Sequence, residues 1–300
     1  MSSVFLHSPL NINLSLVEMV KAAAREIGVK YDTVIDVKTA TCYQRENGLL
    51  TIDYSKMEDM TITYGSDFSM TNRDEAGSLL CSCPERFPLR DELSLRGFSD
   101  PKGHFHPIFL IPLLIIFNRQ MISKEQAPES WKDLLDERWR GKILFPERHL
   151  PACRAILALM RYQFPDRFDK FLENIVFKGS PVDVKNAVDE GQYPLGINKV
   201  SFARYARHKN VTMVWPKEGA FCLPNTMVFK KNANKTLFEL GEYLRSLPVQ
   251  DFFLRQGYIP VSEGLPLLSE AAKNDCRVIW KGWDWFFEIA KAANSEVTEI

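Results

Sequence analysis

Hydrophobic positions in the N-terminal part of the chain alternate between strand-like runs and a helical period. Short apolar runs at Val4–His7, Val34–Val37 and Met60–Tyr64 have the length of buried strands. Between the first two runs, apolar residues recur every three or four positions from Asn13, a favoured N-cap residue, to Gly28, a favoured helix end. This order of elements predicts an α/β fold with a largely parallel sheet.

The middle of the chain has clearer helix signals. The apolar spacing predicts helices over Pro151–Tyr162, Asp166–Ile175 and Pro181–Glu190. The third begins after Ser180, a good N-cap residue, with a proline at the first helical position and an acid three residues after the cap. Gly191 stands where this helix should end.

Two long apolar runs predict buried strands that cross between two lobes. The run Pro107–Phe117 is too short to span a bilayer and contains two prolines. A second run lies at 220–230, and we expect crossings near 104–112 and 220–230. Aromatic residues near the C-terminus predict a helix that packs through them.

Composition narrows the class of protein. The chain has 300 residues, 45% hydrophobic and 25% charged, which suits a globular protein with two lobes of ordinary size. Lys+Arg and Asp+Glu both number 38, so the net charge is zero. This balance gives no support for a nucleic-acid partner or for a polybasic membrane surface.

The N-terminus and the cysteines bear on the compartment. The first ten residues lack a basic region followed by a long apolar stretch, so no secretory signal is evident. The chain is therefore expected to be cytoplasmic as it stands, or extracytoplasmic if a signal was removed. The six cysteines include Cys81-Ser-Cys83 but no set with zinc-site spacing, and we expect free thiols.

The segment Pro128–Pro146 carries a family resemblance. It predicts a short amphipathic helix, a turn at Gly141 and a buried strand. It resembles the opening of the second lobe in the class II periplasmic solute-binding proteins, the ferric-ion, thiamine and polyamine receptors of ABC importers. The helices over 151–190, then Y-P-L-G-I-N and V-T-M-V-W-P-K-E-G-A, follow in the order of that family. More loosely, the resemblance extends from Val4 to Val261.

This resemblance implies a two-lobed, class II periplasmic-binding-protein-like α/β fold with a ligand cleft between the lobes. Lobe 1 is expected to be discontinuous, at 1–106 plus 224–262, and lobe 2 to span 107–223. Residues 263–300 are expected to form a C-terminal helical segment packing across the lobes. The implied function is capture of a small ligand by hinge closure, without a cofactor, by a monomer that has an ABC permease partner if exported. A cytosolic solute sensor or carrier is the alternative within this class.

Ligands of open α/β sheets bind beyond the carboxyl ends of strands, where helix N-termini present free N–H groups. Serines in such turns suit an oxyanion or carboxylate, although each could simply cap a helix. Arginines could add charge, and acids are few in these segments, so an anion or a metal–anion complex is favoured. The residues expected to contact the ligand are His7, Ser8, Ser66, Asp67, Ser69, Glu147, Arg148, Cys153, Arg154, Asn198, Lys199, Ser201 and Glu218.

Three histidines raise the question of metal binding. Ferric-ion receptors of the family place a histidine after the first strand, as His7 is placed here, and an adjacent tyrosine pair in the second lobe. Tyr193 and Tyr205 lie in that region but are not adjacent, so these three are only weak candidates for metal ligands. His104 and His106 share one face of an extended chain, and no residue near them in sequence completes a site.

Cys153 supports a competing hypothesis, an enzyme on the same scaffold. It lies in the first turn of the predicted helix from Pro151, where the helix N-terminus lowers a thiol pKa. Some enzymes of thiamine metabolism resemble this fold and use a cysteine nucleophile. No general base can be assigned, and a buried, inert thiol is the simpler interpretation.

Overall fold

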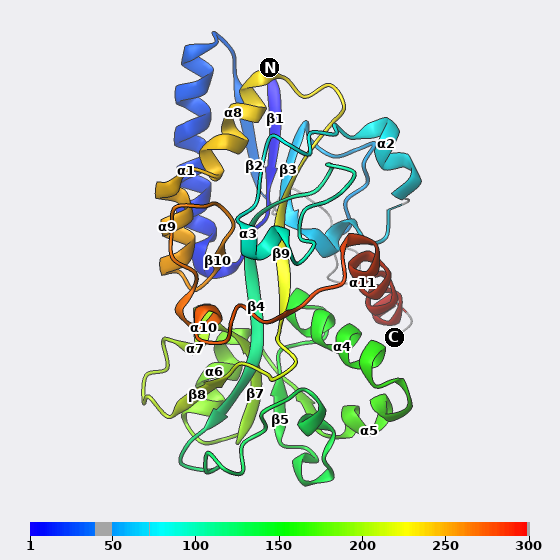
Figure 1. The fold of residues 1–300 in the computed structure, drawn as a ribbon, viewed down its shortest axis with the longest axis vertical. Coiled ribbons are helices and arrows are strands. Elements are labelled where there is room, and N and C mark those ends of the chain that lie inside the picture. Colours follow the sequence, from blue (N-terminus) through cyan, green and yellow to red (C-terminus); the bar gives the residue numbers. More distant parts are fainter. Residues whose placement is uncertain (40–49, 72, 299–300) are drawn as a thin grey trace. The chain divides into compact units, whose positions relative to one another are not determined.

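The computed structural model describes residues 1–39, 50–71 and 73–298, and it divides into two compact units. Cys42 lies outside the described residues. Figure 1 shows the helices and strands of both units. Unit 1 contains Met1–Leu110, Pro224–Pro266 and Lys281–Phe287, and unit 2 contains Ile111–Leu223, Leu267–Trp280 and Glu288–Ile300.

Unit 1 is built on strands that lie in the order β2, β1, β3, β9. The first three are parallel, and β9 is antiparallel to β3. The strands are β1 (Ser2–Leu6), β2 (Ile35–Thr39), β3 (Met60–Tyr64) and β9 (Ala220–Phe229), with β10 (Ile259–Pro260) paired to β4 (His106–Asn118). The helices are α1 (Leu10–Lys30), α2 (Ala76–Leu79), α3 (Asp91–Ser94), α8 (Lys235–Leu244) and α9 (Leu247–Arg255), with 3-10 turns at Gly65–Phe68 and Arg73–Glu75.

Unit 2 has the strand order β4, β7, β5, β6, in which β5 is parallel to both of its neighbours. The strands are β5 (Ile143–Phe145), β6 (Ile175–Phe177), β7 (Leu195–Lys199), β8 (Val211–Val214) and β11 (Val278–Ile279). The helices are α4 (Pro151–Gln163), α5 (Phe168–Glu173), α6 (Pro181–Asp189), α7 (Val200–Ala203) and α10 (Ser269–Ala272), and α11 (Trp283–Thr298) begins in unit 1. Three 3-10 turns lie at Lys132–Leu135, Glu137–Trp139 and Pro165–Arg167.

The strands β4 and β9 belong partly to each unit. The chain passes from unit 1 to unit 2 between Leu110 and Ile111 of β4 and returns between Leu223 and Pro224 of β9. Both points lie inside the segments predicted to cross. Every residue of both strands is buried.

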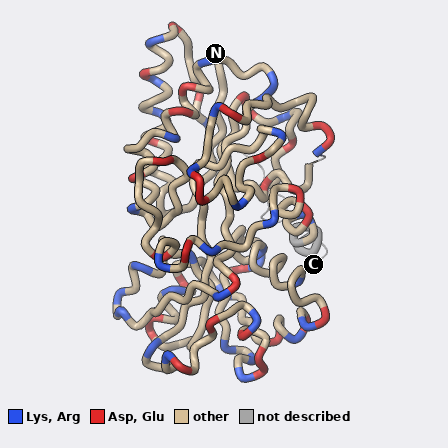
Figure 2. Tube along the Cα trace, viewed as in Figure 1, with Lys and Arg blue, Asp and Glu red and all other residues tan. Residues whose placement is uncertain are grey.

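Charged residues of both signs are interspersed along the trace, as expected for a chain with no net charge (Figure 2). No helix within the described part of the chain is long and apolar enough to cross a bilayer.

Several predicted element boundaries were wrong. Helix α1 begins at Leu10, directly after Pro9, and continues past Gly28 to Lys30. Gly28 is needed for a close approach, because a Cβ atom there would lie 2.7 Å from the carbonyl oxygen of Thr33. The helix predicted over Asp166–Ile175 is shorter, because Ile175 begins strand β6.

The amphipathic segment after Pro128 forms two 3-10 turns instead of the predicted helix. Trp131 fixes this segment, since it is fully buried and its indole N–H donates to the carbonyl of Gly219 at 2.9 Å. The predicted turn at Gly141 is present with a φ of +64°, and the predicted strand follows as β5.

Candidate functional site

The carboxyl ends of β1 and β3 bring a polar cluster together in unit 1. His7 Nδ1 lies 3.1 Å from Thr63 Oγ1 and 3.2 Å from Asp67 Oδ2. The Thr63 hydroxyl donates to the same carboxylate oxygen. Ser8 donates to Asn13 Oδ1 at 3.1 Å, which ties this serine to helix α1. The parallel register of β1 and β3 explains the cluster, because both strands end at one edge of the sheet.

Several buried polar atoms of this edge have no hydrogen-bond partner among the described residues. They are Ser66 Oγ, Asp67 Oδ1, Asn225 Oδ1 and Thr226 Oγ1. Buried polar groups are almost always hydrogen-bonded, so such atoms indicate a bound ligand or ordered water. Sequence analysis missed Asn225, whose Nδ2 donates to the His7 carbonyl at 3.3 Å. A signal existed, because Asn225 and Thr226 interrupt an otherwise apolar run.

In unit 2, the ends of β5 and β7 lie at one edge of the sheet. The strands are parallel, with Leu144 opposite Gly196. Asn198 helps to position the chain, since its Nδ2 donates to the Pro181 carbonyl at 2.7 Å and its Oδ1 accepts from Lys199 N at 2.8 Å. Lys199 is buried at this edge, and burial lowers the pKa of its amine to about 8.

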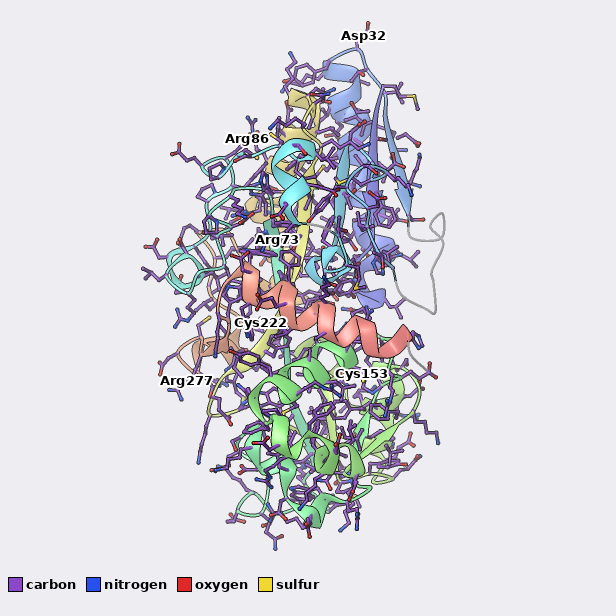
Figure 3. All side chains as sticks on the ribbon, turned by 90° about the vertical axis from the view of Figure 1, so that its right-hand side faces the viewer. Asp32, Arg73, Arg86, Cys153, Cys222 and Arg277 are labelled. Atoms are coloured by element: carbon purple, nitrogen blue, oxygen red, sulfur yellow. The ribbon has the colours of Figure 1, made fainter. Side chains whose placement is uncertain are left out.

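Helix α4 follows β5 and contributes positive charge to the same edge. Arg154 is buried in its first turns, whereas the exposed Arg148 places its guanidinium 4.4 Å from the centre of the Phe177 ring. Figure 3 labels Cys153 on this helix. Burial raises the pKa of its thiol well above the ordinary value, although the charges of Arg148 and Arg154 act in the opposite direction. Cys153 is therefore a protonated thiol.

Ser201 completes the donor set of unit 2. It is buried in α7, and its hydroxyl has no partner within the described ranges. Lys199 and Ser201 are close in sequence at the end of β7, and Arg154 follows the end of the neighbouring β5. An ammonium, a guanidinium and a hydroxyl are donors that suit an anionic ligand.

The comparisons identify the family. The family model of the bacterial extracellular solute-binding protein matches residues 85–288. The chain belongs to this family. It is a solute-binding protein. A search of curated protein sequences gave no significant match.

Solved structures show the same fold along nearly the whole chain. The apo ferric ion-binding protein A of Pasteurella haemolytica has a TM-score of 0.74 at 13% identity, covering 99% of this chain and 96% of that one. The ferric binding protein of Campylobacter jejuni has a TM-score of 0.73 at 14% identity, covering 100% and 99%. Iron-bound HitA of Pseudomonas aeruginosa has a TM-score of 0.70 at 15% identity, covering 99% and 98%. The chain thus has the mixed α/β fold of periplasmic binding proteins.

Some predicted site residues of this solute-binding protein have other partners. Glu218 accepts hydrogen bonds from the backbone N–H groups of Trp131 and Lys132, at 3.2 Å and 3.5 Å, so it caps a 3-10 turn. The exposed Glu147 places its Oε2 atom 3.4 Å from His149 Nδ1. Ser69 is buried in unit 1, and its backbone N–H donates to the Ser66 carbonyl at 3.1 Å.

The two tyrosines considered as metal ligands lie on different sides of β7 and α7 in the chain. Tyr193 precedes β7 and so lies toward its amino end, opposite Lys199, where it lines a hollow of about 480 Å³ beside α6. Tyr205 follows α7 and is 62% exposed. Within the residues that the structure describes, no group of three or more His, Cys, Asp or Glu side chains is arranged to hold a metal ion.

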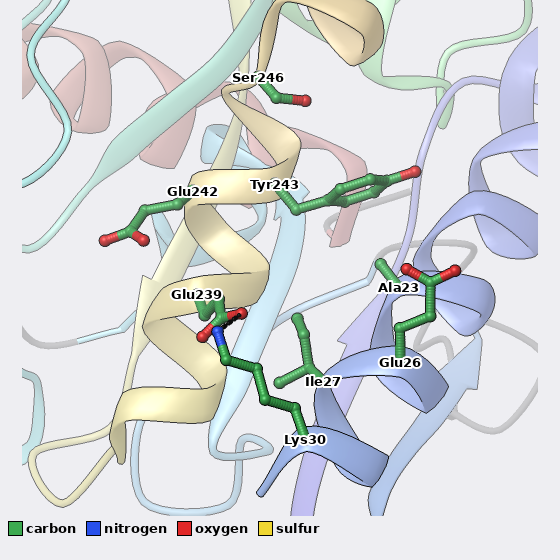
Figure 4. A pocket seen from close by; sticks show the side chains of 8 residues that line it. All are labelled: Ala23, Glu26, Ile27, Lys30, Glu239, Glu242, Tyr243 and Ser246. Atoms are coloured by element: carbon green, nitrogen blue, oxygen red, sulfur yellow. Dashed lines mark hydrogen bonds and ion pairs between the residues drawn. The ribbon is translucent and has the colours of Figure 1, made fainter.

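A hollow in unit 1 is lined by acidic side chains, in contrast to the positively charged strand edge of unit 2. It has a volume of about 440 Å³, lies between α1 and α8, and is lined by Glu26, Glu239 and Glu242 (Figure 4). Lys30 Nζ lies 2.7 Å from Glu239 Oε1 across it. This hollow is remote from the carboxyl ends of the strands and has too many carboxylates to attract an anion.

Proposed function

We propose that this protein captures a small anionic solute, an oxyanion, a carboxylate or a metal–anion complex, with the residues at the carboxyl ends of β5 and β7. The observation that carries the proposal is the burial of Lys199 together with that of Ser201, two residues later in the chain, whose hydroxyl has no partner among the described residues. A buried lysine is costly when charged, and an anion would offset that cost. Arg154 provides a second buried charge from α4.

Unit 1 would select among anions. The unpartnered Asp67 Oδ1 and Asn225 Oδ1 can only accept hydrogen bonds from a ligand. A ligand with a hydroxyl or a protonated oxygen would satisfy them, whereas a fully deprotonated simple anion would be repelled by Asp67. The polar cluster around His7 therefore favours a hydroxylated or partly protonated anion.

Capture would use hinge closure, in which contacts from both units favour the closed state. A ligand can shift that equilibrium only by the difference in its affinity for the two states. The partner would then be an ABC permease, as for the importer receptors that the sequence resembles. Among the solved structures of similar fold are an apo ferric ion-binding protein and an iron-bound protein, HitA. In this chain Tyr193 and Tyr205 do not form the adjacent tyrosine pair of the ferric-ion receptors. This difference favours an anion over bare ferric ion as the ligand.

The alternative of a cysteine-dependent enzyme has less support. A nucleophilic cysteine needs an accessible thiolate, and Cys153 has a buried, protonated thiol. His149, the nearby imidazole, instead pairs with Glu147. Binding without turnover therefore agrees better with this site.

A thermal-shift screen tests the ligand class. Oxyanions, hydroxycarboxylates, thiamine-like compounds, polyamines and metal ions are tested separately, and we expect a concentration-dependent rise in melting temperature with an anion. Arg148→Met and Ser66→Ala should weaken that response far more than Glu218→Gln. Stabilisation by polyamines alone, or the reverse order of the variants, would contradict an anionic ligand.

A further inference from the structure

Two cysteines of unit 1 are held close together, away from the residues proposed to contact the solute. Cys81 N donates to the Phe229 carbonyl and Cys83 N donates to the Gly103 carbonyl, both at 2.9 Å. Leu80, directly before them, is extended, with a φ of −105° and a ψ of 151°. Side chains two residues apart in an extended chain lie on the same face, so the two thiols point to one side.

The two thiols contact each other and a histidine. The Cys83 side chain is hydrogen-bonded to the Cys81 side chain, and Cys83 Sγ lies 3.2 Å from His106 Nε2. Burial is the main cause that lowers the pKa of His106 to about 3, so the ring is neutral beside the thiol. His104 Nδ1 lies 3.2 Å from the Cys81 carbonyl oxygen. The two histidines therefore hold the cysteine segment in place.

Exposure separates this pair from the other cysteines that the structure describes. Both are free thiols and partly exposed, so a reagent in solution can reach them, whereas the other three thiols are buried, at Cys153, Cys222 and Cys276. Burial raises the pKa of Cys83 to about 12, so this sulfur holds little thiolate at neutral pH. Cys81 is therefore the sulfur that reacts first.

We propose that Cys81 and Cys83 form a reversible dithiol–disulfide pair that exchanges with low-molecular-weight disulfides of the glutathione type. The Cys81 sulfur attacks one sulfur of the small disulfide, whose S–S bond breaks, and the first small thiol leaves with the Cys81 proton. The Cys83 sulfur then attacks the Cys81 sulfur of this mixed disulfide, and the second small thiol leaves with the Cys83 proton. Two electrons pass from the protein to the small disulfide, and one S–S bond forms in the protein.

The geometry favours a disulfide that is easily reduced. Two extended residues span about 7 Å between Cα atoms, at the upper limit for a disulfide, so closure has to bend the chain. So short a loop removes little entropy from the unfolded chain, and the bond adds little stability. Oxidation also removes the Cys83 thiol proton and so weakens the hydrogen bond with His106. All three effects favour the reduced form, as is typical of labile disulfides and not of structural ones.

Equilibration in glutathione buffers tests the proposal on the reduced full-length protein. After an acid quench and alkylation with N-ethylmaleimide, trypsin releases residues 74–86, a peptide that contains Cys81 and Cys83 and no other cysteine. We expect glutathione disulfide to convert this peptide to an internal disulfide, lighter by two hydrogen atoms. Excess glutathione should restore both thiols, while the buried Cys153 and Cys222 remain free thiols throughout.

Two single variants separate the two steps of the exchange. Cys83→Ser should stop at the mixed disulfide, so its peptide gains one glutathione. Cys81→Ser should react at least about tenfold more slowly than the wild type, because Cys83 holds little thiolate. Cys153→Ser is the matched control, since it removes a buried thiol, and should behave as the wild type. Circular dichroism verifies the folding of each variant.

Three outcomes would overturn the proposal. In the first, both thiols of the peptide persist even in a large excess of glutathione disulfide. In the second, a disulfide joins this peptide to a cysteine elsewhere in the chain. In the third, the internal disulfide forms but resists excess glutathione. These outcomes do not depend on anion capture, because neither cysteine belongs to the residues proposed to contact the solute.

Discussion

At the scale of single residues, Lys199 links stability to binding. A fall in pKa from 10.5 to about 8 corresponds to about 3 kcal/mol, the cost of keeping the buried amine charged. Below pH 8 the folded and unfolded states are both protonated, so the cost is fully present. Between pH 8 and 10.5 only the unfolded state retains the proton, so stability rises with pH.

Replacing Lys199 with methionine should therefore raise stability at pH 7, by up to about 3 kcal/mol, and remove the rise of stability above pH 8. Urea unfolding at several pH values measures both effects. Lys170→Met, at a position that is 67% exposed, is the control and should change stability little. A Lys199→Met protein that is less stable than the wild type at pH 7 would show that the amine is stabilised in the fold.

Cys153 gives a second prediction at this scale. Its buried thiol should resist alkylation at pH 7 in the native protein, while the partly exposed Cys81 reacts. Cys153→Ser should leave ligand affinity within about twofold of the wild type, because a protonated thiol provides little charge to a ligand. Rapid alkylation of Cys153, mapped by mass spectrometry, would revive the enzyme hypothesis.

At the scale of elements, the N-terminus of α6 has the capping box that the sequence predicts. Asp183 N donates to Ser180 Oγ at 3.4 Å, and Ser180 N donates to Asp183 Oδ2 at 2.7 Å. Ser180→Ala should cost about 1 kcal/mol. Ser15→Ala, at an exposed position inside α1, should be neutral or slightly stabilising. Equal effects of the two substitutions in chemical denaturation would contradict the cap.

The elements best predicted from sequence were those set by local chemistry. Strand β4 could be predicted from the length of its apolar run alone. The N-terminus of α6 could be predicted from its N-cap sequence alone. The segment after Pro128 was less predictable, because the burial of Trp131 against Gly219 depends on residues far along the chain. The α/β fold and the family were recognised from the order of elements, and both are confirmed.

The candidate site was less predictable, because side-chain partners decide it. The sequence analysis selected serines and arginines as ligand contacts only because they follow predicted strands. The capping role of Glu218 and the place of Asn225 depend on strand pairing across the chain. The hydrogen-bond contact between Cys83 and His106 was likewise not predictable, because these two residues meet only in the fold.

At the scale of the whole molecule, hinge closure predicts a change in size. Small-angle X-ray scattering should show a smaller radius of gyration with a stabilising anion than without ligand. The change should vanish for a compound that gives no thermal shift, since such a compound has no differential affinity for the closed state. An unchanged radius despite tight binding would indicate capture without closure.

The most direct test of the central claim is isothermal titration calorimetry of the best anion against wild type, Lys199→Met and Lys170→Met. If the anion binds at Lys199, binding near pH 9 takes up protons, because the anion favours the charged amine whose pKa is about 8 in the free protein. We predict buffer-dependent enthalpy for the wild type and Lys170→Met, and a loss of at least about tenfold in affinity for Lys199→Met, equal to ~1.4 kcal/mol. Equal affinity in all three proteins, with no proton uptake, would contradict the claim that this protein captures an anion through Lys199.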